Sequence, residues 1–343
     1  MTPSGQTSAE HEELLRRAAA AGIHRIAVPT PFLVGRVNCY LIEERPLTLV
    51  DTGPNSGKSL DELEVAMAAL GHAIEDLELI VITHQHIDHL GLLEVLARRS
   101  GAEVAALDRL APYLESFGAS VAADDEFSME VMRRHGVPVD MARALSMVGA
   151  AFRAFGSSGH VSRPLSDGDD LVVGDRTLRV LHRPGHSPSD TIFVDQTRGI
   201  LIAGDHLLPH ISSNPVVSRP LGGGPGAQRP HALMDYLESM RATRELSLNL
   251  ILPGHGDPFA DHVGLIDERF RMHERRARKL LRMLASAPLT AYELATRMWG
   301  NVAVTQAYLT ISEVLGHMDL LVARHEVAES DEDGVTRFHA TVR

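Results

Sequence analysis

Short apolar runs broken by glycine and proline fill the chain up to residue 50, after an opening polar segment. Three of these runs are separated by turn-forming residues, which predicts an antiparallel meander of strands. They lie at 26–28, 38–42 and 47–50. Farther along, apolar runs at 79–82 and 103–107 predict strands, while the patterns at 90–99 and near 108–117 are helical. This alternation indicates an α/β fold.

Strand-like runs return after residue 160, beginning with a predicted hairpin around Gly174 and Asp175. Three further apolar runs predict buried strands. They lie at 192–194, 200–203 and 248–252. An amphipathic helix predicted at 261–284 then carries seven basic side chains. A basic helix face is commonly solvated, but it could also attract an anionic substrate such as a coenzyme A or carrier-protein phosphate.

The segment from about 108 to 159 departs from the α/β alternation. It is helical in pattern and, from residue 119, rich in methionine and phenylalanine. We predict a helical insertion here. Because flexible methionine side chains suit an adaptable apolar surface, the insertion either packs a small core of its own or forms a lid over a substrate cleft.

Residues 285–343 have the pattern of a separate small domain. Helical patterns are followed by an apparent hairpin at 325–342, which is the element order of a winged helix. The segment 286–343 holds four arginines, no lysine and eight acidic residues, and acids crowd the tip of the predicted wing. These charges would repel phosphates. We therefore expect this domain to pack against the rest of the chain, or against a second subunit in a homodimer, rather than to bind DNA.

Composition excludes several classes of function. The 343 residues include 33 Lys and Arg against 45 Asp and Glu, a net charge of −12, which opposes non-specific attraction to nucleic acid or anionic lipid. Cys39 is the single cysteine, so no intrachain disulfide can form. The sequence has neither a signal-peptide pattern nor an apolar run of membrane-spanning length. We expect a cytoplasmic protein that binds neither nucleic acid nor membranes.

One stretch, residues 81–91, concentrates groups that bind metals. Three histidines and an aspartate fall within six positions, directly after an apolar run. They are His84, His86, Asp88 and His89. Such groups are costly to bury together without a positive charge to satisfy them, so the cluster predicts a metal site. In a chain with 19 histidines, the same window could also arise by chance as an exposed polar stretch.

Three more ligand-type residues, His186, Asp205 and His255, each follow a glycine directly. With these residues in order, the sequence resembles the metallo-β-lactamase fold superfamily of hydrolases over about residues 24–265. Five separated motifs carry the resemblance. They are Asp51-Thr52-Gly53, the His84 to His89 cluster, His186, Asp205 and His255. The glyoxalase II branch and the thioesterase-like branch with a C-terminal winged helix are the most similar.

The resemblance implies a fold and a domain division. Residues 1–284 are expected to form an αββα sandwich, the metallo-β-lactamase catalytic domain, with the helical insertion at about 108–159. Residues 285–343 are expected to form the winged-helix-like domain. Asp51 has two interpretations. It could cap the helix that follows, or, as the resemblance suggests, lie beneath the metal ligands and orient a coordinating histidine.

The family pattern also implies which residues hold which metal. One ion would be held by His84, His86 and His186, and the other by Asp88, His89 and His255. Asp205 would bridge the two ions, and Asp88 and Asp205 are the expected catalytic carboxylates. Two divalent ions are expected. Zinc is the first choice, although ligands without a thiolate also suit iron or manganese.

We predict a hydrolase of a small ester-type substrate, a thioester or a lactone, in which a metal-bound hydroxide attacks the ester. Acyl-CoA and acyl-carrier thioesters are candidates. The bridging Asp205 argues against β-lactamase activity, since the antibiotic-degrading members lack it. A phosphodiesterase or ribonuclease with the same metal pair is the alternative, as is a mononuclear-iron enzyme like sulfur dioxygenases. His206 and His210, at the start of a long Gly/Pro-rich loop, are candidates for substrate contact.

Overall fold

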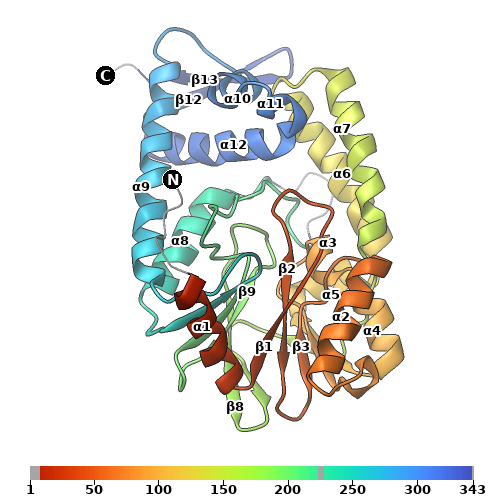
Figure 1. Ribbon diagram of the computed structural model, residues 1–343. Coiled ribbons are helices and arrows are strands. Elements are labelled where there is room, and N and C mark those ends of the chain that lie inside the picture. Colours follow the sequence, from red (N-terminus) through yellow and green to blue (C-terminus); the bar gives the residue numbers. More distant parts are fainter. Residues whose placement is uncertain (1–7, 223–227, 342–343) are drawn as a thin grey trace.

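The computed structural model describes residues 8–222 and 228–341. Two β-sheets stack face to face, with helices on their outer sides (Figure 1). The first sheet has the strand order β1-β2-β3-β4-β5-β6. These strands are β1 (Ile23–Val28), β2 (Val37–Ile42), β3 (Thr48–Val50), β4 (Leu79–Val81), β5 (Glu103–Leu107) and β6 (Arg163–Leu165). Strands β1 to β3 form the predicted antiparallel meander, and β3 to β6 are parallel.

The second sheet has the order β11-β10-β9-β8-β7. Its strands are β7 (Asp170–Val173), β8 (Arg176–His182), β9 (Thr191–Asp195), β10 (Ile200–Gly204) and β11 (Leu250–Pro253). All neighbours are antiparallel except β10 and β11, which are parallel. The β7–β8 pair is the predicted hairpin, and Gly174 in its turn has a φ of 59°, a left-handed conformation that glycine adopts readily.

Helices cover both outer faces of the sandwich. The outer side of the first sheet packs α2 (Gly57–Ala69), α4 (Leu93–Ser100) and α5 (Ala111–Glu115). The outer side of the second sheet packs α8 (Ala232–Arg244) and the first half of α9 (His262–Met283). The N-terminal helix α1 (Ser8–Ala20) contributes to the core between the sheets. Short α3 (Ile87–Leu90) follows β4.

The layers follow from the alternation of side chains along each strand. In β2, Cys39 belongs to the core beneath the first helical layer, whereas Tyr40 belongs to the core between the sheets. In β9, Phe193 lies between the sheets, whereas Ile192 and Val194 pack against α8. Both sheets are therefore buried on two sides, and the αββα metallo-β-lactamase sandwich predicted from the sequence is confirmed.

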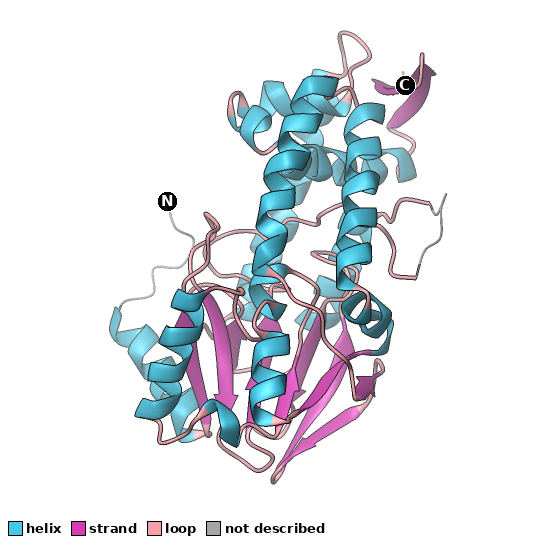
Figure 2. Ribbon diagram, turned by 90° about the vertical axis from the view of Figure 1, so that its right-hand side faces the viewer, coloured by secondary structure: helices cyan, strands magenta, loops and turns pink. Residues whose placement is uncertain are grey.

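A helical unit stands at one end of the sandwich (Figure 2). It combines the insertion, as α6 (Phe117–Arg134) and α7 (Val139–Phe152), with the second half of α9 and the C-terminal elements. The C-terminal elements are α10 (Ala291–Trp299), α11 (Val302–Thr305), α12 (Ala307–Ala323), β12 (Val327–Glu332) and β13 (Val335–Ala340). Helices followed by a hairpin are the predicted element order.

One continuous core joins this helical unit. Met132 of α6, Leu280 of α9, Leu294 of α10 and Phe338 of β13 all belong to the same buried cluster. The insertion therefore does not pack a core of its own. It shares one with residues 285–340, so apolar packing continues across the domain boundary predicted at residue 284.

A long loop links β10 to α8. Its described parts, residues 205–222 and 228–231, contain neither helix nor strand, and residues 223–227 of the predicted Gly/Pro-rich loop lie outside the described residues. Among the described helices, none combines the length and apolar character that crossing a membrane requires.

Candidate metal centre

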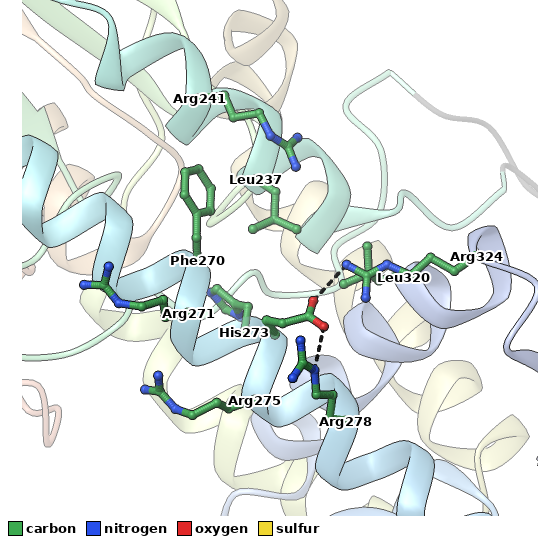
Figure 3. A pocket seen from close by; sticks show the side chains of 10 residues that line it. Leu237, Arg241, Phe270, Arg271, His273, Arg275, Arg278, Leu320 and Arg324 are labelled. Carbon is green, nitrogen blue, oxygen red and sulfur yellow. Dashed lines mark hydrogen bonds and ion pairs between the residues drawn. The ribbon is translucent and has the colours of Figure 1, made fainter.

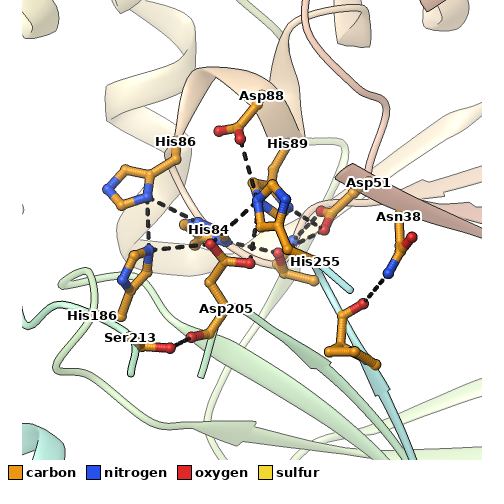
Figure 4. Close-up of polar contacts among 12 residues, drawn as sticks. Asn38, Asp51, His84, His86, Asp88, His89, His186, Asp205, Ser213 and His255 are labelled. Atoms are coloured by element: carbon orange, nitrogen blue, oxygen red, sulfur yellow. Dashed lines mark hydrogen bonds and ion pairs between the residues drawn. The ribbon is translucent and has the colours of Figure 1, made fainter. Parts of the chain in front are cut away.

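The predicted metal ligands come together at the carboxyl ends of strands from both sheets (Figure 4). The loop after β4 carries His84 and leads into α3. The loops after β8, β10 and β11 carry His186, Asp205 and His255. Because these strand ends open toward the same region, side chains distant in sequence point to a common centre.

Three imidazoles form the first group of this centre. Nδ1 of His86 lies 3.1 Å from Nε2 of His84 and 2.9 Å from Nε2 of His186. All three side chains are mostly or fully buried. Three ring nitrogens at such distances could hold one metal ion.

Asp88, His89 and His255 form the second group. Asp88 and His89 lie on the single turn of α3. Oδ2 of Asp88 lies 3.3 Å from Nε2 of His255, and the ligand atoms of all three residues lie within 4.8 Å of one another. This group could hold a second metal ion.

The carboxylate of Asp205 lies between the two groups. Its Oδ1 is 3.4 Å from Nε2 of His89. Its Oδ2 is 3.5 Å from Nε2 of His186 in the first group and 3.6 Å from Nε2 of His255 in the second. One side chain therefore faces both groups, which is the position a bridging ligand needs.

Two atoms of the centre show that the residues fit a cation. Among the described residues, neither Nε2 of His89 nor Oδ1 of Asp205 has a hydrogen-bond partner, although both atoms are buried. They face each other at 3.4 Å without the geometry of a hydrogen bond. Buried polar atoms are costly to leave unpaired, and a metal ion between the ligands would satisfy both.

The protonation states of the first ligand group suit metal binding. Burial, together with the neighbouring imidazoles, holds the pKa of His84 well below its usual range and lowers the pKa of His86 to about 3. Neutral imidazoles keep the lone pair that binds a metal. Burial opposes ionisation of Asp205, but His255 and His89 outweigh it and hold the pKa of that carboxyl well below its usual range. In the second group, burial opposes protonation of His89 and His255, but Asp205 outweighs burial and raises the pKa of both rings, so these two rings must lose a proton when a metal binds.

Asp51 lies directly beneath the centre. Its Oδ2 is 2.8 Å from Nδ1 of His89, so the Nε2 atom of that ring points toward the ligands. The Thr83 N–H donates to Oδ1 and the Thr83 hydroxyl to Oδ2, each at 2.9 Å. Helix α2 is capped by Ser56 instead. The contacts of Asp51 are thus those of a residue that orients a histidine, not those of a helix cap.

Two backbone carbonyls orient other histidines, and no sequence pattern points to either of them. The Arg36 carbonyl lies 2.8 Å from Nδ1 of His255, and the Asn214 carbonyl lies 3.0 Å from Nδ1 of His186. The Asn214 side chain in turn donates to the Leu309 carbonyl of α12 at 3.0 Å. The loop that orients His186 is therefore attached to the C-terminal helices.

Gly254 leaves the space that Asp205 occupies. A Cβ atom at residue 254 would lie 2.3 Å from Oδ1 of Asp205 and 2.9 Å from Cε1 of His89. Real Cβ atoms do not approach other heavy atoms so closely. The glycine before His255 is therefore a packing requirement of the centre.

The two histidines expected to contact substrate have different positions. His206 is fully buried, its Nε2 lies 2.9 Å from Oγ1 of Thr243 in α8, and burial lowers its pKa to about 3. It faces the helical layer, which does not support substrate contact. His210 is exposed at the rim, close enough to Gly256 that a Cβ there would lie 2.6 Å from its Nδ1. Of the two, His210 remains the candidate for substrate contact.

Comparison with known proteins identifies similar chains. The model of the metallo-beta-lactamase superfamily matches residues 33–255. A probable metallo-hydrolase of Bacillus subtilis is 33% identical over 318 residues, which cover 93% of this chain and 97% of that protein. An atrochrysone carboxyl ACP thioesterase of Aspergillus fumigatus is 24% identical over 148 residues, 43% of this chain and 32% of that protein.

Two solved structures share the fold over nearly the whole chain. A metallo-beta-lactamase family protein of Thermus thermophilus has 27% identity and a TM-score of 0.76, with 93% of this chain and 99% of that one covered. A beta-lactamase domain protein of Burkholderia ambifaria has 27% identity and a TM-score of 0.74, with 93% and 92% covered. Because both matches extend over 93% of this chain, they include the helical unit as well as the sandwich.

Proposed function

The chain belongs to the metallo-β-lactamase superfamily, and from that premise we propose that it is a dinuclear-metal hydrolase of an acyl thioester or a lactone. The position of Asp205 carries the proposal. Its carboxylate lies within 3.6 Å of His186 in one ligand group and of His255 in the other. A hard, charged oxygen ligand between two groups favours two divalent ions held close together, with zinc as the first choice and iron or manganese as alternatives.

When bound, the two cations would supply Lewis acidity that activates water and polarises the scissile carbonyl. The chain's own contribution is to hold the reacting groups and move a proton. Burial opposes ionisation of Asp88, but the hydrogen bond from His255 and the charge of His89 hold its pKa below the usual range. We assign to this charged carboxylate the role of accepting a hydrogen bond from the attacking water and taking up its proton.

Apolar side chains on the segments that hold the ligands support an acyl substrate. Leu33 is 92% exposed and lies three residues before Arg36, whose carbonyl orients His255. Ile211 is 40% exposed, in the loop whose Asn214 carbonyl orients His186. Exposed apolar groups on the two loops that orient the ligands suit a substrate with an apolar portion.

The insertion adds to this apolar surface. Met147 of α7 is 76% exposed, and the Phe152 ring of the same helix lies 5.3 Å from the ring of Phe32, next to Leu33. The β1–β2 loop and α7 therefore meet, and the carbonyl of Arg36 in the same loop orients His255. The fungal relative is named a thioesterase, which agrees with an acyl substrate for this chain. In this proposal α7 is one wall of the acyl-binding region.

The experiment is a substrate panel on metal-loaded protein. The panel contains acyl-CoA thioesters, acyl-homoserine lactones, p-nitrophenyl esters and bis-p-nitrophenyl phosphate. We expect thioester or lactone cleavage to exceed phosphodiester cleavage. Asp205→Asn should lower the rate at least about 100-fold, because a neutral amide is a poor bridging ligand. Elemental analysis should find two metals per chain in the wild type and fewer in the variant.

Asp61→Asn is the matched control, since Asp61 is exposed on α2 and the same charge is removed away from the centre. Its rate and metal content should equal those of the wild type. Phosphodiester cleavage well above ester cleavage would replace the proposed substrate class with the phosphodiesterase alternative. One iron per chain together with oxygen consumption would contradict hydrolysis and favour the mononuclear-iron alternative.

A further inference from the structure

A hollow lies on the surface between α8, α9 and α12 (Figure 3). Its volume is about 520 Å³, and five of its ten lining residues are arginines. They are Arg241, Arg271, Arg275, Arg278 and Arg324. None of the lining residues belongs to the metal centre described above. We call this hollow the arginine groove.

The arginine groove is strongly positive in an acidic protein. Among the described residues, Glu274 is the only carboxylate that lines it, and both Arg278 at 2.9 Å and Arg324 at 3.0 Å bind this side chain. Five guanidinium charges against one carboxylate leave four positive charges in excess, in a chain whose net charge is −12. Such a concentration of one sign attracts ligands of the opposite sign.

Two neighbouring arginines of α9, Arg271 and Arg275, are available to a ligand. They lie one turn apart on α9, both are exposed, and within the described parts of the chain neither has a hydrogen bond or an ion pair. Like charges at this spacing on a helix repel each other. A bound anion would offset that repulsion and interact with both guanidinium groups.

The lining of the groove also includes apolar side chains. Leu237, Phe270 and Leu320 contribute to it, and the Arg241 guanidinium lies 5.7 Å from the centre of the Phe270 ring. A flat or apolar part of a ligand could pack on these side chains while its charged part meets the arginines. A bare inorganic ion would leave the apolar surface unused.

The excess of arginines disfavours a cation as the ligand of the groove. His273 lines the groove, and its Nδ1 lies 3.4 Å from Nε2 of His317 and 3.9 Å from Oε1 of Glu313. These three residues could hold a metal ion by their spacing. However, Arg276 already binds the Glu313 carboxylate, so a metal ion would have to displace a guanidinium group.

We infer that the arginine groove binds a small organic phosphate, a molecule in which phosphate groups are joined to a flat or apolar moiety. The planar guanidinium group donates paired hydrogen bonds that match phosphate oxygens, and it is less strongly hydrated than an ammonium group. This inference does not depend on the proposed ester chemistry, because the groove and the metal centre have no residue in common.

The test is a binding titration on metal-loaded, full-length protein with ADP, pyrophosphate and adenosine as probes. We expect ADP to bind more tightly than either of its parts. Arg275→Glu should weaken ADP binding by about tenfold or more, since charged hydrogen bonds are lost and a repulsive carboxylate is added. The ADP affinity of Arg275→Lys should lie between that of Arg275→Glu and that of the wild type, because a lysine keeps the charge but not the planar guanidinium group.

Arg98→Glu is the matched control, since Arg98 is exposed on α4, away from the groove. It should leave ADP binding unchanged, and all variants should keep the ester-hydrolysis rate and the melting temperature of the wild type. Equal ADP binding by wild type and Arg275→Glu would overturn the inference, because the metal centre would then be the binding site. Binding of single-stranded RNA that grows stronger with length, and exceeds that of ADP, would replace the small ligand with a nucleic acid.

Discussion

The Nδ1 atom of His89 lies 2.8 Å from Oδ2 of Asp51, and Asp51 itself has a φ of 59°. A non-glycine residue in the left-handed region is uncommon and is held there by its surroundings. Here the two carboxylate oxygens accept from Thr83 as well as facing His89. The backbone conformation thus directs the carboxylate under the ring of a candidate metal ligand.

Asp51→Asn tests this relationship. Asparagine tolerates the left-handed conformation, but its amide cannot accept from both Thr83 and His89. The His89 ring then loses the partner that fixes its Nε2 toward the centre. We expect metal affinity to fall about 10- to 100-fold, measured by competition with a chelator, while the melting temperature of the metal-free protein changes little. Asp61→Asn should keep the metal affinity of the wild type. An unchanged metal affinity in Asp51→Asn would contradict the role of Asp51 in orienting His89.

Gly254→Ala tests the packing of the centre. The added methyl group would lie 2.3 Å from Oδ1 of Asp205, so the carboxylate must move away from its place between the two ligand groups. We expect metal content below that of the wild type and hydrolysis reduced in proportion, measured by elemental analysis and by rate. Gly118→Ala in α6, where a Cβ meets nothing within 4 Å, should bind metal normally. Full metal occupancy in Gly254→Ala would mean that Asp205 can shift without loss.

His206 and His210 make a matched pair of substitutions. His206→Ala removes a buried ring and leaves Thr243 unpaired, so the free energy of unfolding should fall by about 2–3 kcal/mol. The KM of the folded enzyme should not change. His210→Ala should raise the KM and leave the free energy of unfolding unchanged, because this side chain is exposed at the rim of the centre. A raised KM in His206→Ala with unchanged stability would restore its expected contact with substrate.

His135 makes stability depend on pH. Burial, followed by the charge of Arg229, lowers its pKa to about 3, below the value of about 6.5 in an unfolded chain. The ring stacks on Phe338 of β13 at 6.1 Å. Below pH 6.5 the unfolded state takes up a proton that the folded state does not, so this histidine lowers the free energy of unfolding as pH falls toward 3.

The measurement compares wild type with His135→Gln, in which the titrating group is absent. Between pH 6 and pH 4.5 the wild type should lose about 1.4 kcal/mol per pH unit relative to the variant. Chemical unfolding at several pH values gives both free energies, and the other buried histidines cancel in the difference. A difference that stays constant with pH would contradict the shifted pKa of His135.

Local patterns explain why so much of the centre could be predicted. His84, Asp205 and His255 each follow a strand within a few residues, and a strand is recognisable from its apolar run. Once several strands share a sheet, their ends are close in space whatever the sequence distance. The structure brings together all seven residues expected to hold metal. Their role as ligands remains a prediction that the metal analysis above addresses.

Other features depend on contacts that no local pattern carries. His206 follows Asp205 directly, yet it faces Thr243 of α8, and only the packing of that helix decides its direction. The carbonyls of Arg36 and Asn214 could be supplied by any residue type. An apolar stripe such as that of α6 shows that a helix is buried but not against what, so the core shared with Phe338 could not be foreseen.

The bond from Asn214 to the Leu309 carbonyl has a practical consequence. The Tyr308 hydroxyl also donates to the Val217 carbonyl, and Arg229 binds Asp319 at 2.7 Å. The last sixty residues thus brace the loop whose backbone sets the angle of His186. Shortening the gene to the sandwich alone would remove these three contacts. A shortened version of this enzyme therefore has to retain the C-terminal helices or replace the three contacts by design.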